Sequence, residues 1–396
     1  MNLVEAAADR AFRAAVRDWM ATELAGEFAP LREARGPGAP GFDLDLARRW
    51  EQRLAAGGWV GIGWPRAAGG DGLPLSQQLV FHEEYVRAGG PGRIGHIGET
   101  LLAPTLIEHG SAALRERFLP AIRAGTEYWA QGYSEPGAGS DLANVQTRAT
   151  LAHGTWVLRG QKLWTSWARE ADWIFVLARS EAGSKRHQGL TLLLVPLRQP
   201  GIEVRPIRQI GGGAEFNEVY FDGARTEGWM HLGDCGQGWR VAMSLLGHER
   251  GASTLGQQAH FRRELECMVD LARRRGADAV LRRRLARAAL GLQMLRRHAL
   301  RVLGAPPSTS GSTATGAALV SKYAWSNWHR DLGRLAADLL GADADVVADD
   351  DPGSDPDPDR SALQQLWLSS RADTIYAGTN EIQLNLIAER GLGMPR

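Results

Sequence analysis

Apolar residues recur at roughly helical spacing along the first third of the chain. Near the N-terminus, one side of such a helix carries Leu3, Ala7, Phe12, Val16 and Trp19. Similar spacing continues to about residue 124, with breaks at the Gly- and Pro-containing segments 36–41 and 57–74. The pattern predicts an α-helical N-terminal domain over residues 1–125.

The pattern changes to short β-rich runs between about residues 128 and 232. Residues 173–177 read Trp-Ile-Phe-Val-Leu, and residues 190–197 form a similar run. Runs of this length, rich in β-branched and aromatic residues and bounded by turns, are typical of strands. We therefore expect an all-β domain over residues 126–236.

Helical spacing returns after Gly238 and predicts a second helical domain over residues 237–396. Its most regular stretches are residues 260–274 and 279–303. Residues 304–316, rich in Pro, Ser, Thr and Gly, predict a connection between helices. Residues 349–359 hold six aspartates and three prolines, which predict an exposed loop.

Composition supports a folded protein with more than one domain. The chain has 396 residues, of which 44% are hydrophobic and 23% are charged, which fits two or three packed domains. The 46 Lys and Arg residues nearly balance 45 Asp and Glu residues, so no overall field favours nucleic acid or an anionic membrane. The many arginines in residues 273–301 alternate with Leu and Ala at helical spacing, which favours a solvated helix face.

The sequence also argues against a membrane span, a secretion signal and a metal site. No run of eighteen apolar residues occurs, and charged residues interrupt the first twenty positions. Two cysteines are too few for a disulfide framework, which suits a reducing compartment. His82-Glu83-Glu84 lacks the second histidine of a zinc helix. We expect a cytoplasmic protein without a metal.

Three segments could bind a ligand, although each has a simpler explanation. Residues 133–141 read Tyr-Ser-Glu-Pro-Gly-Ala-Gly-Ser-Asp, and the backbone amides of such a loop can bind phosphate. Residues 161–168 carry two indoles and two hydroxyls that could stack on a flat ring and hydrogen-bond to its edge. Residues 375–383 combine a Gly-Thr turn with a helix start. Taken singly, these segments also fit a tight turn, core aromatic residues and a plain helix start.

Together, in this order and over this length, the three segments closely resemble the acyl-CoA dehydrogenase family. Further matching segments are residues 216–219 with 221–222, 236–239, 248–250 and 387–395. The resemblance implies an α+β multi-domain fold with an N-terminal helical domain, a middle β-barrel or sandwich and a C-terminal four-helix bundle. It also implies FAD as cofactor, usually in a tetramer with the flavin lying partly between subunits.

The resemblance also implies roles for individual residues. Gln131, Tyr133, Ser134 and Ser140 would lie along the flavin ring and pyrophosphate, with Ser140 also near the CoA thioester. Trp164 and Ser166 would flank the isoalloxazine ring. The ribityl and adenosine portions would be approached by Gly378, Thr379 and Glu381.

Family members remove the α-proton of an acyl-CoA with a carboxylate while a β-hydride passes to the flavin, leaving a trans-2-enoyl-CoA. In many members the carboxylate stands immediately before the Gly-Thr of the last motif, but this chain has Ala377 there. Other members carry the base at the position matched by Glu249, so the resemblance implies Glu249 as base and Arg250 as a substrate-positioning residue. Spacing alone would instead favour a solvated, charged helix face at these two positions.

Two FAD-anchoring elements of many homotetrameric members are missing, and residues 273–276 and 349–359 occupy those regions. This departure resembles the mycobacterial-type branch of two-chain heterotetramers, some of which oxidise CoA thioesters of sterol side chains. The resemblance implies a homo- or heterotetramer with a paralogous subunit, an acyl-CoA substrate and an electron-transfer flavoprotein or similar acceptor. A non-catalytic partner subunit and a flavin oxidase or monooxygenase are the alternative functions.

Overall fold

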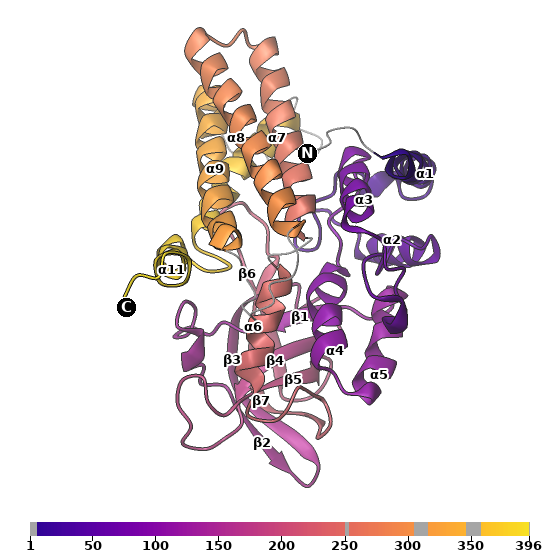
Figure 1. Cartoon of the computed structure of the whole chain (residues 1–396), viewed down its shortest axis with the longest axis vertical. Helices are drawn as coiled ribbons and strands as arrows, with labels where there is room; N and C mark the ends of the chain where they lie inside the picture. Colours follow the sequence, from indigo (N-terminus) through magenta and orange to yellow (C-terminus); the bar gives the residue numbers. More distant parts are fainter. Residues whose placement is uncertain (1–5, 250–252, 305–315, 346–357, 396) are drawn as a thin grey trace. The chain divides into compact units, whose positions relative to one another are not determined.

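The computed structural model describes residues 6–249, 253–304, 316–345 and 358–395. The chain divides into two compact units, residues 1–252 and 253–396. Figure 1 shows helices and a sheet in the first unit and helices alone in the second. The predicted order of helical, β and helical regions is thereby confirmed.

Helices of the first unit come mainly from the N-terminal third of the chain. They are α1 (Ala7–Glu23), α2 (Leu44–Ala56), α3 (Leu75–Arg87), α4 (Ala103–His109) and α5 (Ala112–Arg123). A π-helical segment, Ile97–Leu102, leads directly into α4. Asp43 caps α2 and Ser111 caps α5 by accepting a hydrogen bond from the amide three residues later. The first helix and the two interruptions agree with the apolar spacing.

The β-region forms an eight-stranded sheet. Its strands are β1 (Trp129–Gly132), β2 (Arg148–Ala152), β3 (Thr155–Ser166), β4 (Trp173–Arg179), β5 (Leu190–Pro196), β6 (Ile202–Ile207), β7 (Phe216–Glu227) and β8 (His231–Leu232). Their order is β6-β7-β3-β2-β4-β5-β8, and β1 pairs with β4 in parallel. Most other neighbours are antiparallel, and β2 and β3 form a hairpin closed by the turn at His153 and Gly154.

Strand β4 is buried on both faces because it separates two apolar cores. Phe175 and Leu177 point into a core shared with the helices, whereas Ile174 and Val176 point into a core made by the strands. This alternation follows from the two-residue period of a strand. The sheet is strongly curved around the core made by the strands. Strands β7 and β5, which are not neighbours in the strand order, come close enough for Thr226 Oγ1 to donate to the Leu194 carbonyl at 2.7 Å.

Helix α6 (Gly238–Glu249) belongs to the first unit, although the sequence assigned it to the second helical domain. Val241, Ala242 and Leu245 pack into the core shared with the helices and the sheet. The helix contacts β5, α4 and the π-helical segment. Burial of this apolar stripe joins α6 to the sheet.

The second unit is built from helices. They are α7 (Ser253–Arg274), α8 (Ala279–Leu303), α9 (Gly316–Leu340), α10 (Pro358–Ser369) and α11 (Asn380–Leu386), followed by a π-helical turn at Ile387–Gly391. One apolar core contains residues of α7, α8, α9 and α10, among them Met268, Leu292, Ala336 and Leu366. No helix of the described residues is long and apolar enough to cross a membrane.

The two predicted connections in this unit fall largely outside the described residues, at 305–315 and 346–357. The acidic loop was predicted to extend to Asp359, but α10 already begins at Pro358. Proline suits the first position of a helix because the amide there has no partner within the helix. The prediction was therefore wrong for the last two residues of that loop.

Candidate functional site

The first candidate segment is a turn that follows β1. Gln131 lies on β1, and Tyr133 is buried just beyond it, with its ring edge-on to Phe175. Two backbone hydrogen bonds between Glu135 and Ala138, of 3.1 and 3.0 Å, close the turn. The turn then leads to Ser140, which is exposed.

The second candidate segment lies at the end of β3, where the strand leaves its regular pairing with β7. The register shifts between Lys162 and Thr165, and Trp164 between them adopts a left-handed φ of 60°. A bulky residue rarely adopts this conformation, which costs roughly 1–2 kcal/mol. The Trp164 side chain is 55% exposed, which is unusual for an indole within a strand. The bulge thus presents a large flat ring on the surface of the unit.

The structure brings these two segments together. The Leu163 amide donates to the Ser134 carbonyl at 2.8 Å, which joins the bulge to the turn. Lys162 Nζ donates to the Tyr133 carbonyl at 3.0 Å, to Glu135 Oε1 at 2.8 Å and to the Leu177 carbonyl at 2.7 Å. A buried ammonium with three acceptors therefore fixes the turn against β3 and β4.

Glu135 is the acidic partner in this buried arrangement. Its carboxylate also accepts hydrogen bonds from the amides of Gln146 at 2.6 Å and Thr147 at 2.9 Å. Burial alone would raise the pKa of Glu135, but Lys162 and the two amides hold it below its usual range. Burial lowers the pKa of Lys162 to about 8 against the opposing effect of Glu135. Both residues lie inside the segments predicted to bind a ligand, at 133–141 and 161–168, but neither of them was assigned a role from the sequence.

The joined segments are suited to a flat, polar ligand. They present the exposed indole of Trp164 beside the hydroxyl-bearing residues Ser134 and Ser166, and Ser140 ends the turn. Within the described residues, no hydrogen bond occupies the hydroxyls of these three serines. An indole face stacks on aromatic rings, and hydroxyls can bond to ring heteroatoms or phosphate oxygens. The residues present therefore fit a flavin.

The third candidate segment belongs to the second unit. Ala377 and Gly378 both adopt left-handed φ angles, of 52° and 92°. Thr379 then caps α11, since its hydroxyl accepts a hydrogen bond from the Ile382 amide at 3.3 Å. Glu381 lies in the first turn of that helix and is exposed. The predicted turn and N-cap are both present.

The candidate base and its neighbour are described only in part. Glu249 is the last residue of α6, and its side chain lies outside the described structure, as does the whole of Arg250. The turn before Glu249 is anchored to α4 through Glu108, whose carboxylate accepts a hydrogen bond from Ser244 Oγ at 2.7 Å. His248 Nε2 lies 3.3 Å from the same carboxylate. These contacts hold the end of α6 in place.

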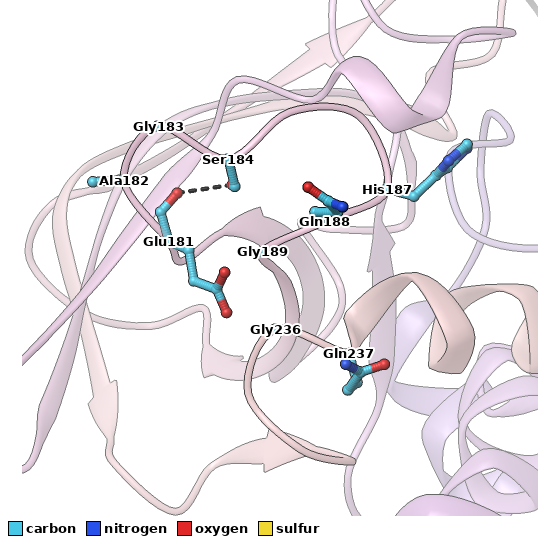
Figure 2. A pocket seen from close by; sticks show the side chains of 9 residues that line it. All are labelled: Glu181, Ala182, Gly183, Ser184, His187, Gln188, Gly189, Gly236 and Gln237. Carbon is cyan, nitrogen blue, oxygen red and sulfur yellow. Dashed lines mark hydrogen bonds between the residues drawn. The ribbon is translucent and has the colours of Figure 1, made fainter.

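An open hollow of about 530 Å³ lies between the β4–β5 loop and the turn before α6 (Figure 2). Its lining is polar and includes Glu181, Ser184, Gln188 and Gln237. None of the site residues predicted from the sequence lines it. Within the described part of the chain, no cluster of three or more His, Cys, Asp or Glu side chains could hold a metal ion.

Models of three protein-family domains match successive parts of the chain. They are the acyl-CoA dehydrogenase N-terminal domain at residues 6–126, the middle domain at residues 130–224 and the C-terminal domain at residues 236–392. The chain is 52% identical to the acyl-CoA dehydrogenase IpdE1 of Mycobacterium tuberculosis, over 97% of each protein. It is 50% identical to IpdE1 of Mycolicibacterium smegmatis, again over 97% of each.

Solved structures show the same similarity. The Tcur3481-Tcur3483 steroid ACAD has a chain with a TM-score of 0.84 and 31% identity, and the match covers 100% of both chains. A chain of the ChsE4-ChsE5 complex from Mycobacterium tuberculosis has a TM-score of 0.82 and 26% identity, also over 100% of both chains.

Proposed function

Because this chain belongs to the acyl-CoA dehydrogenase family, whose members are flavin-dependent oxidoreductases acting on CH-CH bonds, we propose that it dehydrogenates an acyl-CoA at the α,β position with Glu249 as base. The main support for this proposal is that the Tyr133–Asp141 turn and the Trp164 bulge lie together, joined by the buried Lys162–Glu135 ion pair and a backbone hydrogen bond. This union supplies a rigid surface with an exposed indole and hydroxyls. Such a surface is suited to an isoalloxazine ring.

The residues of this chain would have distinct tasks in the reaction. Trp164 and Ser166 would orient the flavin, together with Gln131, Tyr133 and Ser134. Ser140 would also hold the thioester end of the substrate. Gly378, Thr379 and Glu381 would serve the ribityl and adenosine portions. Bound FAD supplies the hydride acceptor.

Glu249 would take the α-proton of the acyl group, and Arg250 would position the substrate. Ala377 has no group that accepts a proton, so the position used by many relatives is unavailable here. A carboxylate abstracts such a proton only where the thioester carbonyl is stabilised by hydrogen bonds in a dry site. The anchoring of α6 through Ser244 and Glu108 supports a fixed location for the Glu249 backbone.

We propose that the substrate is a CoA thioester derived from a steroid and that a paralogous subunit completes the enzyme. Similarity to a structure described as a steroid ACAD supports the substrate class. Similarity to chains from two-protein assemblies supports the partner, as does the lack of two FAD-anchoring elements in this sequence. We place the assembly in the cytoplasm, with an electron-transfer flavoprotein or similar acceptor. The sequence boundaries at residues 125 and 236 remain our proposal for the three domains.

The test uses Glu249→Gln in the assembled, FAD-loaded protein with a steroid-derived acyl-CoA. Turnover to the enoyl-CoA is expected to fall by about 10²- to 10⁴-fold, which is the usual contribution of a general base. Exchange of the α-proton with deuterium oxide, followed by mass spectrometry, should fall with it. Glu116→Gln on α5 is the matched control, since Glu116 is exposed and lies outside all three motifs.

Unchanged turnover in Glu249→Gln would exclude Glu249 as the base. Turnover that is lost in variants of the partner subunit but kept in Glu249→Gln would identify this chain as a non-catalytic subunit. Hydrogen peroxide formed in step with substrate loss would instead indicate an oxidase. Purified alone, the chain is expected to be colourless, and full FAD occupancy in a homotetramer would contradict the need for a partner.

A further inference from the structure

A buried cluster of charged groups crosses the second unit. His329 on α9 is 7% exposed, and both of its ring nitrogens meet carboxylates. Nδ1 lies 2.6 Å from Asp373 Oδ2, and Nε2 lies 2.8 Å from Glu264 Oε2 on α7. An ionised carboxylate has no proton to donate, so each ring nitrogen must donate a hydrogen bond to its carboxylate. The histidine is therefore an imidazolium that links α7, α9 and the 3-10 turn at Ala372–Thr374.

The cluster continues from Asp373 to Tyr376. Tyr376 Oη donates to Asp373 Oδ1 at 2.9 Å, so each oxygen of this buried carboxylate has a donor. Lys322 on α9 donates to the Asp373 carbonyl, and its Nζ lies 4.9 Å from the centre of the Tyr376 ring. An unbroken series of contacts thus runs from Glu264 through His329 and Asp373 to Tyr376.

Tyr376 stands immediately before the left-handed pair Ala377 and Gly378. An alanine at positive φ costs roughly 1–2 kcal/mol, so contacts outside the turn must help to hold it. The Ile375 and Tyr376 amides both donate to the Ala372 carbonyl, at 2.8 and 3.1 Å. The charged cluster holds the same few residues through side chains, since Tyr376 Oη bonds to Asp373 and Lys322 bonds to the Asp373 carbonyl.

Bundle stability alone does not require these charges. A buried ionic cluster is often no more stabilising than well-packed apolar residues of similar volume. Apolar packing is already present here, since the Phe261 ring stacks on His329 with 4.1 Å between ring centroids. What apolar residues cannot do is hold Asp373 and the Tyr376 hydroxyl in a fixed direction.

We propose that His329 is a positioning residue that, through Asp373, holds Tyr376 and so fixes the Ala377–Gly378 turn for cofactor binding. The inference rests on the proposed function only in naming FAD as the ligand that the turn binds. The positioning itself concerns contacts within one unit.

The charge of His329 supplies a readout for this role. Burial would lower the pKa of His329, but hydrogen bonds to Asp373 and Glu264 raise it to about 9. The charged groups facing it are Glu264 from α7 and Asp373 from the 3-10 turn, with Lys322 on its own helix bonded to Asp373. Loss of the proton above that pH removes one donor from the cluster.

The test is amide hydrogen exchange of the full-length chain without FAD, with protection factors corrected for intrinsic rates. Tyr376→Phe removes only the last link and leaves the imidazolium with both carboxylates, whereas His329→Gln removes the charge. Both variants are expected to reduce protection of the Ile375 and Tyr376 amides by about tenfold or more, as expected for a lost bond to a charged group. Wild-type protection at these amides should fall between pH 8 and pH 10, and Tyr376→Phe should already be low at pH 8.

His298→Gln is the control, because His298 on α8 bonds only to the Ser321 hydroxyl at 3.0 Å in the described structure. It should leave protection at the turn unchanged. Full protection in both Tyr376→Phe and His329→Gln would overturn the proposal. An equal loss of protection at all α9 amides in Tyr376→Phe would also overturn it, because that result indicates a purely structural role.

FAD affinity of the assembled protein is the second measurement. Both variants are expected to weaken FAD binding by about tenfold. If the two variants lose amide protection at the turn but keep wild-type FAD affinity, the proposal that the turn is fixed for cofactor binding is overturned. Absence of FAD binding in the wild-type assembly would contradict the proposed function, while the exchange measurement would still decide the positioning.

Discussion

Lys162 lies fully buried on β3 with its ammonium 2.8 Å from the carboxylate of Glu135, a residue of the turn after β1. The two residues are separated by 27 positions in the sequence, and the pair joins the turn to the strand that carries Trp164. The site in the first unit depends on Lys162, because its ammonium bonds to both Glu135 and the Tyr133 carbonyl and so joins the turn to the strand.

Replacing Lys162 with Met should strongly destabilise the chain. The change leaves Glu135 buried without its counter-charge, which costs about 3–5 kcal/mol. Urea unfolding followed by tryptophan fluorescence measures the loss. Arg205→Met is the matched control, since Arg205 pairs with Glu203 on an exposed strand and should cost at most about 1 kcal/mol. Equal losses in the two variants would contradict the role given to the buried pair.

Replacing Trp164 with Gly should separate stability from cofactor binding. Glycine relieves the left-handed backbone and removes a side chain that is already 55% exposed, so unfolding free energy should change by less than about 1 kcal/mol. FAD affinity of the assembled protein should fall by about tenfold, from the loss of one stacked ring. Trp229→Gly, at 40% exposure, should leave FAD affinity unchanged. Unaltered FAD binding in Trp164→Gly would argue against stacking at the bulge.

Replacing Gly378 with Ala should destabilise the second unit by about 2–3 kcal/mol. The left-handed backbone accounts for part of this cost, and the new Cβ would lie 2.4 Å from Nε2 of Gln383, which is only 1% exposed. Gly341→Ala is the control, because Gly341 also has a positive φ but its Cβ would meet open space. Gly341→Ala should lower the free energy of unfolding by only about 1 kcal/mol. A thermal or urea unfolding series on both variants distinguishes strain from steric overlap.

Stability should decline at alkaline pH because of His329. Its pKa is raised in the folded chain to about 9 from the ordinary value of 6.5, so the folded state holds the proton more tightly than the unfolded state. This contribution is complete below pH 6.5 and is lost as pH rises through about 9. A pKa shift of this size corresponds to a contribution of about 3 kcal/mol to the free energy of unfolding. Unfolding free energies between pH 6 and pH 10 should therefore fall less in His329→Gln than in the wild type.

The site could be predicted only where neighbouring residues carry the signal. The Tyr133–Asp141 turn and the Gly378–Thr379 helix start were recognisable because turn and capping preferences act within a few residues. The Lys162–Glu135 bond and the His329 cluster were missed because their partners are 27 to 65 positions apart. No local pattern encodes such contacts.

The sequence by itself determined the order of helical and β-regions, since apolar spacing reflects which face of each element is buried. It also determined the chemistry available at each motif, including the lack of a carboxylate at Ala377. Only the tertiary structure decided that α6 joins the first unit, that Trp164 is turned outward by a bulge and that His329 is held as a cation between two carboxylates. These outcomes depend on burial and hydrogen bonds between distant segments, which exist only once the chain has folded.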